Sequence, residues 1–287
     1  MNTFCRIFYL LPFTFFLLLL SACSPSDQER AAALLGEAQA AYETQQLNSA
    51  LVLLDSIDHS CPAAIEVRRE AQQLSYRIQL DVEQRTLHET EVQLVAFNTQ
   101  IDSVLNAQFE YVKSEYDTEA RFVPKGTDAG DVIGRSYIHA AVTERGVTQL
   151  MSTYAGPAAL GHTGLRLETA DGASVATQDI PYNDGSNYQY KILETHYETV
   201  TYEGEKDGGA LAFVALHADD RRLKATLTGG KRDLPVAISD QERTALAASY
   251  ELGIMLRERL RLQHEHRTAE LKVQWLEEKL NGKNLKK

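Results

Sequence analysis

Histidines and acidic side chains are the residues of this sequence that first suggest chemistry. His264 and His266 resemble a metal-binding pair, but residues two apart on a helix are rotated by about 200°, so the two rings cannot share one ion. His217 and Asp219 fit one face of a strand, yet two ligands do not complete a metal site. The oxygen-rich turn at 183–187 lacks the ligand alternation and the closing glutamate of an EF-hand. We therefore predict no metal and no cofactor.

Tyrosines and histidines are concentrated between residues 121 and 236. A tyrosine on a sheet face usually packs against its neighbours, and tyrosines also form glycan-binding and peptide-binding surfaces. Tyr154 and His162 flank the sequence AGPAALG, a flexible loop of the kind that often carries function. We predict a ligand patch formed by Tyr154, His162, Tyr188 and His196.

No catalytic signature accompanies these residues. The sequence has no phosphate-binding glycine loop with the required spacing, no Gly-x-Ser-x-Gly elbow and no His-Glu-x-x-His helix. A non-enzymatic protein is therefore favoured. The rival hypothesis is a hydrolase that acts on an envelope polymer, and it requires a histidine and a nucleophile, or two carboxylates, that converge in one cleft.

The first 22 residues resemble the signal peptide of a bacterial lipoprotein. Arg6 precedes an apolar run of 14 residues, Ile7–Leu20, which is shorter than the roughly 20 residues of a membrane-spanning helix. The sequence LSAC at 20–23 resembles a lipobox, the motif in which the cysteine is acylated. The alternative is an ordinary secretory signal with a chance cysteine. The resemblance implies cleavage before Cys23, lipid on that residue and, because Ser24 follows rather than Asp, an outer-membrane lipoprotein.

The chain after this leader has 265 residues and a net charge of about −12. Such an acidic chain disfavours nucleic acid and anionic lipid headgroups as partners. Cys5 lies in the leader and Cys23 in the lipobox, so Cys61 remains alone and no intramolecular disulfide is expected. We interpret Cys61 as a small buried apolar residue rather than a nucleophile.

Residues 28–62 resemble one tetratricopeptide repeat, in which small residues allow two helices to pack closely. Helices are predicted over 28–45 and 48–57, with Pro62 in the first turn of the next helix. One copy does not make a solenoid, so the resemblance implies a helical hairpin of this style. The residues that carry the resemblance are Ala38, Ala41, Ala50, Leu54, Ile57 and Pro62.

Two longer helical patterns flank the middle of the chain. Apolar residues recur every seven positions between Ala63 and Tyr116, at Leu80, Leu87, Leu94 and Ile101. A second stripe follows an N-cap at Ser239 or Asp240 and continues to Leu280. Neither stripe is stable when exposed, so we expect the two helices to form one long antiparallel, coiled-coil-like hairpin.

The segment between them alternates apolar and polar residues with a period of two, which is typical of strands. Turn sequences such as Asp171-Gly172 separate the runs. Short strands joined by tight turns favour an antiparallel β-sandwich or barrel. Strands are predicted at 136–143, 147–154, 163–169, 188–193, 196–202, 210–216 and 223–228.

The sequence therefore predicts an α+β chain in which a helical stalk presents an inserted β domain. The expected function is that of a membrane-anchored lipoprotein whose β domain binds a protein or glycan of the envelope; a homo-oligomer and a purely structural assembly subunit are further possibilities. The predicted domains are 1–22 (signal peptide), 23–62 (tether and helical hairpin), 63–120 (long helix), 121–236 (β domain) and 237–287 (C-terminal helix).

Overall fold

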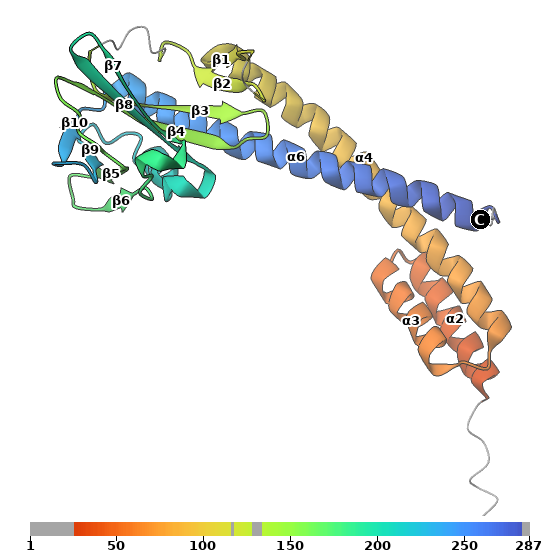
Figure 1. The fold of residues 1–287 in the computed structure, drawn as a ribbon. Helices are drawn as coiled ribbons and strands as arrows, with labels where there is room; N and C mark the ends of the chain where they lie inside the picture. Colours follow the sequence, from red (N-terminus) through yellow and green to blue (C-terminus); the bar gives the residue numbers. More distant parts are fainter. Residues whose placement is uncertain (1–25, 116–117, 128–133, 283–287) are drawn as a thin grey trace, which may run out of the picture. The chain divides into compact units, whose positions relative to one another are not determined.

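The computed structural model describes residues 26–115, 118–127 and 134–282 (Figure 1). The chain divides into two compact units: residues up to 89 together with those from 266 on form the first, and residues 90–265 form the second. The predicted α+β class is confirmed by helices and two antiparallel sheets. None of the described helices is long and apolar enough to cross a membrane.

Three helices begin the first unit: α2 (Asp27–Glu43), α3 (Leu47–Ser60) and α4 (Ile65–Gln108). Ser26 and Glu29 form a capping box at the start of α2, since each side chain bonds the backbone N–H of the other. Ala38 and Ala50 are fully buried between α2 and α3, because small side chains let the two helices approach closely. The two predicted helices are confirmed, and Cys61 is buried as a small apolar residue.

Helix α6 (Asp240–Leu280) contacts α4 within each unit. In the first unit Tyr76 and Trp275 pack edge to face at 5.6 Å between ring centroids. In the second unit Ile101 lies in one cluster with Leu252 and Leu256. The predicted seam is incomplete, because Leu80, Leu87 and Leu94 are only half-buried.

The long helix α4 ends earlier than the heptad pattern predicted. It stops at Gln108, and the chain continues as β1 (Phe109–Val112), which pairs with β2 (Arg121–Pro124). Phe109 is buried against the α4–α6 cluster, and this contact stabilises the strand. The helical reading to Tyr116 was therefore wrong, since aromatic and β-branched residues in this stretch favour a strand once a partner is present.

The second unit contains two open antiparallel sheets (Figure 1). The six-stranded sheet has the order β1-β2-β3-β4-β8-β7, and the four-stranded sheet has the order β10-β9-β5-β6. Because neither sheet closes on itself, the barrel alternative was wrong. The remaining strands are β3 (Tyr137–Thr143), β4 (Thr148–Gly156), β5 (Gly164–Glu168), β6 (Ser174–Ala176), β7 (Asn187–Ile192), β8 (Thr195–Glu203), β9 (Lys224–Thr228) and β10 (Leu234–Val236).

Both sheets contribute to one hydrophobic core. Leu150 of the larger sheet and Leu167 of the smaller one lie in the same buried cluster, together with Leu246 of α6. Six of the seven predicted strands are confirmed. The seventh, 210–216, is instead helix α5 (Ala210–Leu216), and the N–H groups of Gly209 and Leu211 at its start donate to the carboxylate of Asp207.

Two 3-10 turns, η2 (Tyr182–Asp184) and η3 (Gly204–Asp207), flank strands β7 and β8. The predicted N-cap of the C-terminal helix is confirmed at Ser239. Its hydroxyl accepts a hydrogen bond from the Glu242 backbone at 3.2 Å, and the Glu242 carboxylate accepts from the Ser239 N–H at 2.8 Å.

Candidate functional site

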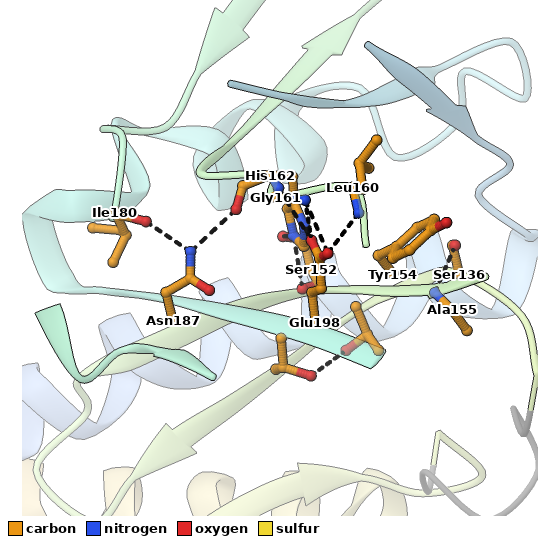
Figure 2. A network of polar contacts seen from close by, with 12 residues as sticks. Ser136, Ser152, Tyr154, Ala155, Leu160, Gly161, His162, Ile180, Asn187 and Glu198 are labelled. Atoms are coloured by element: carbon orange, nitrogen blue, oxygen red, sulfur yellow. Dashed lines mark hydrogen bonds and ion pairs between the residues drawn. The ribbon is translucent and has the colours of Figure 1, made fainter. Parts of the chain in front are cut away.

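Three buried side chains form a line on the core-facing side of the larger sheet (Figure 2). Ser152 projects from β4, Glu198 from β8, and His162 from the loop that leads into β5. Ser152 Oγ lies 3.0 Å from His162 Nε2, and His162 Nδ1 lies 3.1 Å from Glu198 Oε2. The exposed fractions are 0%, 0% and 1% for Ser152, His162 and Glu198.

The Glu198 carboxylate is held by the backbone of the same loop. It accepts hydrogen bonds from the N–H groups of Leu160 at 2.6 Å, Gly161 at 2.8 Å and His162 at 3.1 Å. Burial alone would raise the pKa of Glu198, but the hydrogen bonds from His162 and Gly161 outweigh it and hold the pKa below its ordinary value. The charged carboxylate therefore fastens this loop to β8.

Further polar contacts continue this network. Ser152 Oγ lies 3.1 Å from the hydroxyl of Tyr202, and burial raises the pKa of Tyr202 to about 12. The Asn187 amide donates to the carbonyl oxygens of His162 at 3.1 Å and Ile180 at 2.9 Å, which ties β7 to the same loop (Figure 2). The network thus joins β4, β7, β8 and the loop.

The order serine, histidine, glutamate is that of a hydrolytic triad, in which the histidine activates the serine. The surroundings do not suit that chemistry. A substrate carbonyl has no path to Ser152 Oγ, because the side chain has no exposed surface. The nearby backbone N–H groups that would stabilise an oxyanion already donate to Glu198. The arrangement is therefore a structural network in this conformation.

The opposite face of the larger sheet carries a groove of about 570 Å³. Successive side chains of a strand point to opposite faces. The residues that adjoin the buried network in sequence therefore point to this outer face. Tyr188, for example, is paired with Thr199, which directly follows Glu198. The groove is lined by Tyr137, His139, Thr153, Gly185, Ser186, Tyr188, Tyr190, Thr199 and Thr201.

Aromatic rings form a row of contacts in the groove and beside it. Tyr190 and Tyr197 are nearly parallel, with an interplanar angle of 9° and 5.1 Å between centroids. Tyr188 lies 5.4 Å from Tyr190, and it is 65% exposed. At the β3 side, Tyr137 stacks on His139 at 4.9 Å. The outer face therefore presents aromatic rings beside threonine and serine hydroxyls.

His139 lines this groove and carries a buried polar atom. Its Nδ1 atom is buried and has no hydrogen-bond partner among the described residues. Burial, aided by the positive charge of Arg121, lowers the pKa of His139 from 6.5 to about 4. The ring is therefore neutral near pH 7.

The low pKa of His139 predicts a pH-dependent stability. Between pH 6.5 and pH 4 the unfolded chain binds this proton more readily than the folded protein. The free energy of unfolding therefore decreases as the pH falls through that window, by up to about 3 kcal/mol. Urea unfolding at pH 7 and pH 4 should show a smaller loss for His139→Gln than for the wild type.

An exposed histidine gives the matched control for this measurement. His59 lies on the surface of α3, so His59→Gln is expected to leave the acid-dependent loss in place. Equal losses in His139→Gln and the wild type would contradict a buried, neutral His139.

A second depression, of about 550 Å³, lies where the end of α4 meets the start of α6. Its lining consists of small, aliphatic and amide side chains with one charge of each sign, Lys125 and Asp240. Among the described residues, no group of three histidine, cysteine or acidic side chains lies close enough to hold a metal ion. The aromatic groove therefore remains the best candidate site.

The structure separates the four residues predicted to form a ligand patch. Tyr154 and His162 are buried on the core-facing side, where the Tyr154 hydroxyl donates to the Ala158 carbonyl at 2.7 Å. His196 shares this side of β8 with Glu198 by strand alternation, whereas Tyr188 lies in the outer groove. The predicted single patch was wrong, because the register places its members on two faces. The predicted lipidation site, Cys23, lies outside the described residues.

Sequence reasoning missed three groove residues, His139, Tyr190 and Thr201, as members of one site. A usable signal was present, since Tyr197, Thr199 and Thr201 alternate along one strand and share a face.

Comparisons with protein-family models, with curated proteins and with solved structures find no match to this chain. The function must therefore be argued from the geometry of the site.

Proposed function

We propose that the chain is a membrane-anchored, non-enzymatic lipoprotein whose larger sheet binds a glycan of the cell envelope. The observation that carries the proposal is the outer-face groove, in which tyrosine rings stand beside hydroxyl groups. Sugar rings have apolar C–H faces that pack on aromatic rings, and hydroxyls that bond to polar side chains. The groove offers both kinds of surface at once.

The position of each group supports a sugar over an apolar ligand. Tyr188 and Tyr190 supply exposed ring faces, and Thr199 and Thr201 supply hydroxyls from the adjacent strand. A protein segment that occupies the same groove is the competing outcome of the experiment below.

The proposed membrane anchor rests on the lipobox-like sequence at 20–23. Helices α2, α3 and α4 follow it along the chain before the first strand, and α6 returns from the last strand toward the C-terminus. The proposal gives α4 and α6 the role of an antiparallel helical stalk that presents the β domain. Metabolic labelling with a palmitate analogue tests the anchor, and an unlabelled Cys23 in the envelope fraction would contradict it.

Tyr190→Ala is the variant that tests the groove. It removes a ring from the centre of the aromatic row, and we expect at least about tenfold weaker binding of soluble peptidoglycan strands and of chitotetraose, measured by isothermal titration. Tyr182→Ala is the control, because Tyr182 is also an exposed tyrosine and does not line the groove.

The outcomes separate the possible ligands. Binding that Tyr190→Ala weakens and Tyr182→Ala preserves supports a glycan site in the groove. Binding that both variants preserve places the glycan elsewhere. If neither glycan binds and an envelope protein is retained through Tyr190, the ligand is a protein segment and the glycan proposal fails.

The alternative function is hydrolysis of an envelope polymer. It is favoured by one observation, the line of Ser152, His162 and Glu198 with contacts of 3.0 and 3.1 Å. Complete burial of the serine and the occupied backbone donors count against it. Binding without cleavage is therefore the better-supported function.

A further inference from the structure

The four edge strands of the two sheets differ in how they are protected from pairing with another chain. Exposed edges are usually kept short or interrupted by proline or charge. Strands β1, β6 and β10 have four, three and three residues, and β10 contains Pro235. Strand β7 has six residues, no proline and one charged side chain, Lys191. It is therefore the unprotected edge.

Several exposed residues of β7 and its turn are apolar or aromatic, beside the charged Lys191 and Glu194. Tyr188 is 65% exposed, Ile192 54% and Leu193 88%. Leu193 also has a φ of 53°, a conformation that is unusual for a leucine, and it occupies the tip of the β7–β8 hairpin. Such residues are costly to leave in water, which favours a partner along this edge.

The backbone of β7 has hydrogen-bonding groups that point away from β8. The Thr201 N–H donates to the Ser186 carbonyl at 2.8 Å, so these two residues form a hydrogen-bonded pair. Such pairs recur every second residue in an antiparallel ladder. Tyr188 and Tyr190 therefore direct their backbone groups to β8, while Asn187, Gln189 and Lys191 direct theirs outward from the sheet edge, where Figure 1 places β7.

We infer that β7 pairs antiparallel with β7 of a second copy of this chain, around a two-fold axis at Gln189. Another extended strand is the partner that satisfies a row of outward N–H and C=O groups. The sequence Asn-Tyr-Gln-Tyr-Lys at 187–191 suits self-pairing, because Tyr188 then lies opposite Tyr190 of the second copy and Lys191 lies opposite Asn187. Aromatic cross-strand pairs are favourable, and no like charges meet.

This pairing also joins the two outer faces. Residues directly opposite each other in an antiparallel pair point to the same side, so Tyr188 and Tyr190 of both copies lie on one continuous face. The dimer therefore presents two tyrosine grooves side by side. The inference about pairing does not depend on the glycan, because it rests on the β7 backbone and edge residues alone.

The test uses the chain from Ser24 to Lys287, which contains every described residue, in sedimentation equilibrium over a range of concentrations. Gln189 faces itself across the two-fold axis, so Gln189→Lys and Gln189→Glu each bring like charges together. We expect each variant to dimerise at least about tenfold more weakly than the wild type, and an equimolar mixture to form a heterodimer. Ser174→Lys, on the edge strand β6, is the control and should dimerise normally.

A cysteine variant supplies an independent measurement. Gln189→Cys should form an intermolecular disulfide on mild oxidation, because paired Cα atoms in such a ladder are about 5.5 Å apart. Cys61, the other thiol in this chain segment, is buried. A wild type that stays monomeric at all concentrations, a dimer that Gln189→Lys leaves intact, or a charge-swapped mixture that stays monomeric would overturn the inference.

Discussion

Replacing Glu198 with glutamine is expected to reduce the free energy of unfolding by about 3 kcal/mol or more, measured by urea denaturation at pH 7. The substitution preserves the shape of the side chain but removes the negative charge that three successive backbone N–H groups surround. It also places the N–H donors of an amide among backbone N–H groups, which are themselves hydrogen-bond donors. The loop at 160–162 should consequently exchange its amide hydrogens faster.

Glu203→Gln is the matched control on the same strand. Glu203 is exposed and accepts one hydrogen bond from the Gln149 amide at 2.9 Å, so its replacement should change stability by about 0.5 kcal/mol or less. Because the folded protein lowers the pKa of Glu198, its stabilising contribution is present above pH 4.5 and is lost as the pH falls further. A Glu198→Gln variant as stable as Glu203→Gln would show that the buried network does not hold the loop.

Gly146→Ala is expected to cost about 3 kcal/mol, through two separate effects. Gly146 has a φ of 76°, which is unfavourable for alanine. A Cβ atom there would also lie 2.7 Å from the carbonyl oxygen of Gly253 and 2.9 Å from the backbone nitrogen of Arg257, both on α6. The β3–β4 turn approaches this helix so closely that Arg257 donates to the Gly146 carbonyl at 2.5 Å. An added methyl group would force the turn and helix apart.

Gly172→Ala isolates the conformational part of that cost. Gly172 has a φ of 94° in the β5–β6 turn, and a Cβ atom there would meet nothing within 4 Å. We expect a loss of about 1 to 2 kcal/mol for this variant. Equal losses at the two glycines would mean that close packing of the turn on α6 contributes nothing to stability.

The elements that the sequence predicted best are those with enough residues to show a period. β3, β4 and β8 have seven to nine residues, which is long enough for a strand pattern to be visible in the sequence, and burial alternates most clearly along β8. β6 and β10 have three residues each, which is too short for any pattern. The run at 210–216 is apolar at every position, so its periodicity could not distinguish a strand from the helix α5.

The candidate site was harder to predict, because a strand sequence does not reveal which of its two faces is buried. Tyr197 and Glu198 are neighbours, yet Tyr197 stacks on Tyr190 beside the groove and Glu198 lies in the buried network. The contact between His162 and Glu198 joins residues that are 36 positions apart in the sequence. Such a contact depends on the pairing of β4 with β8 and on the second sheet, neither of which local spacing specifies.

The most direct test of a binding function is to incubate the purified protein with soluble peptidoglycan strands and to analyse both the bound and the unbound polymer by mass spectrometry. Our account predicts that intact strands are retained by the wild type and that their length distribution does not change. Shorter fragments or released peptides that disappear in Ser152→Ala would contradict it and would assign hydrolysis to Ser152, His162 and Glu198.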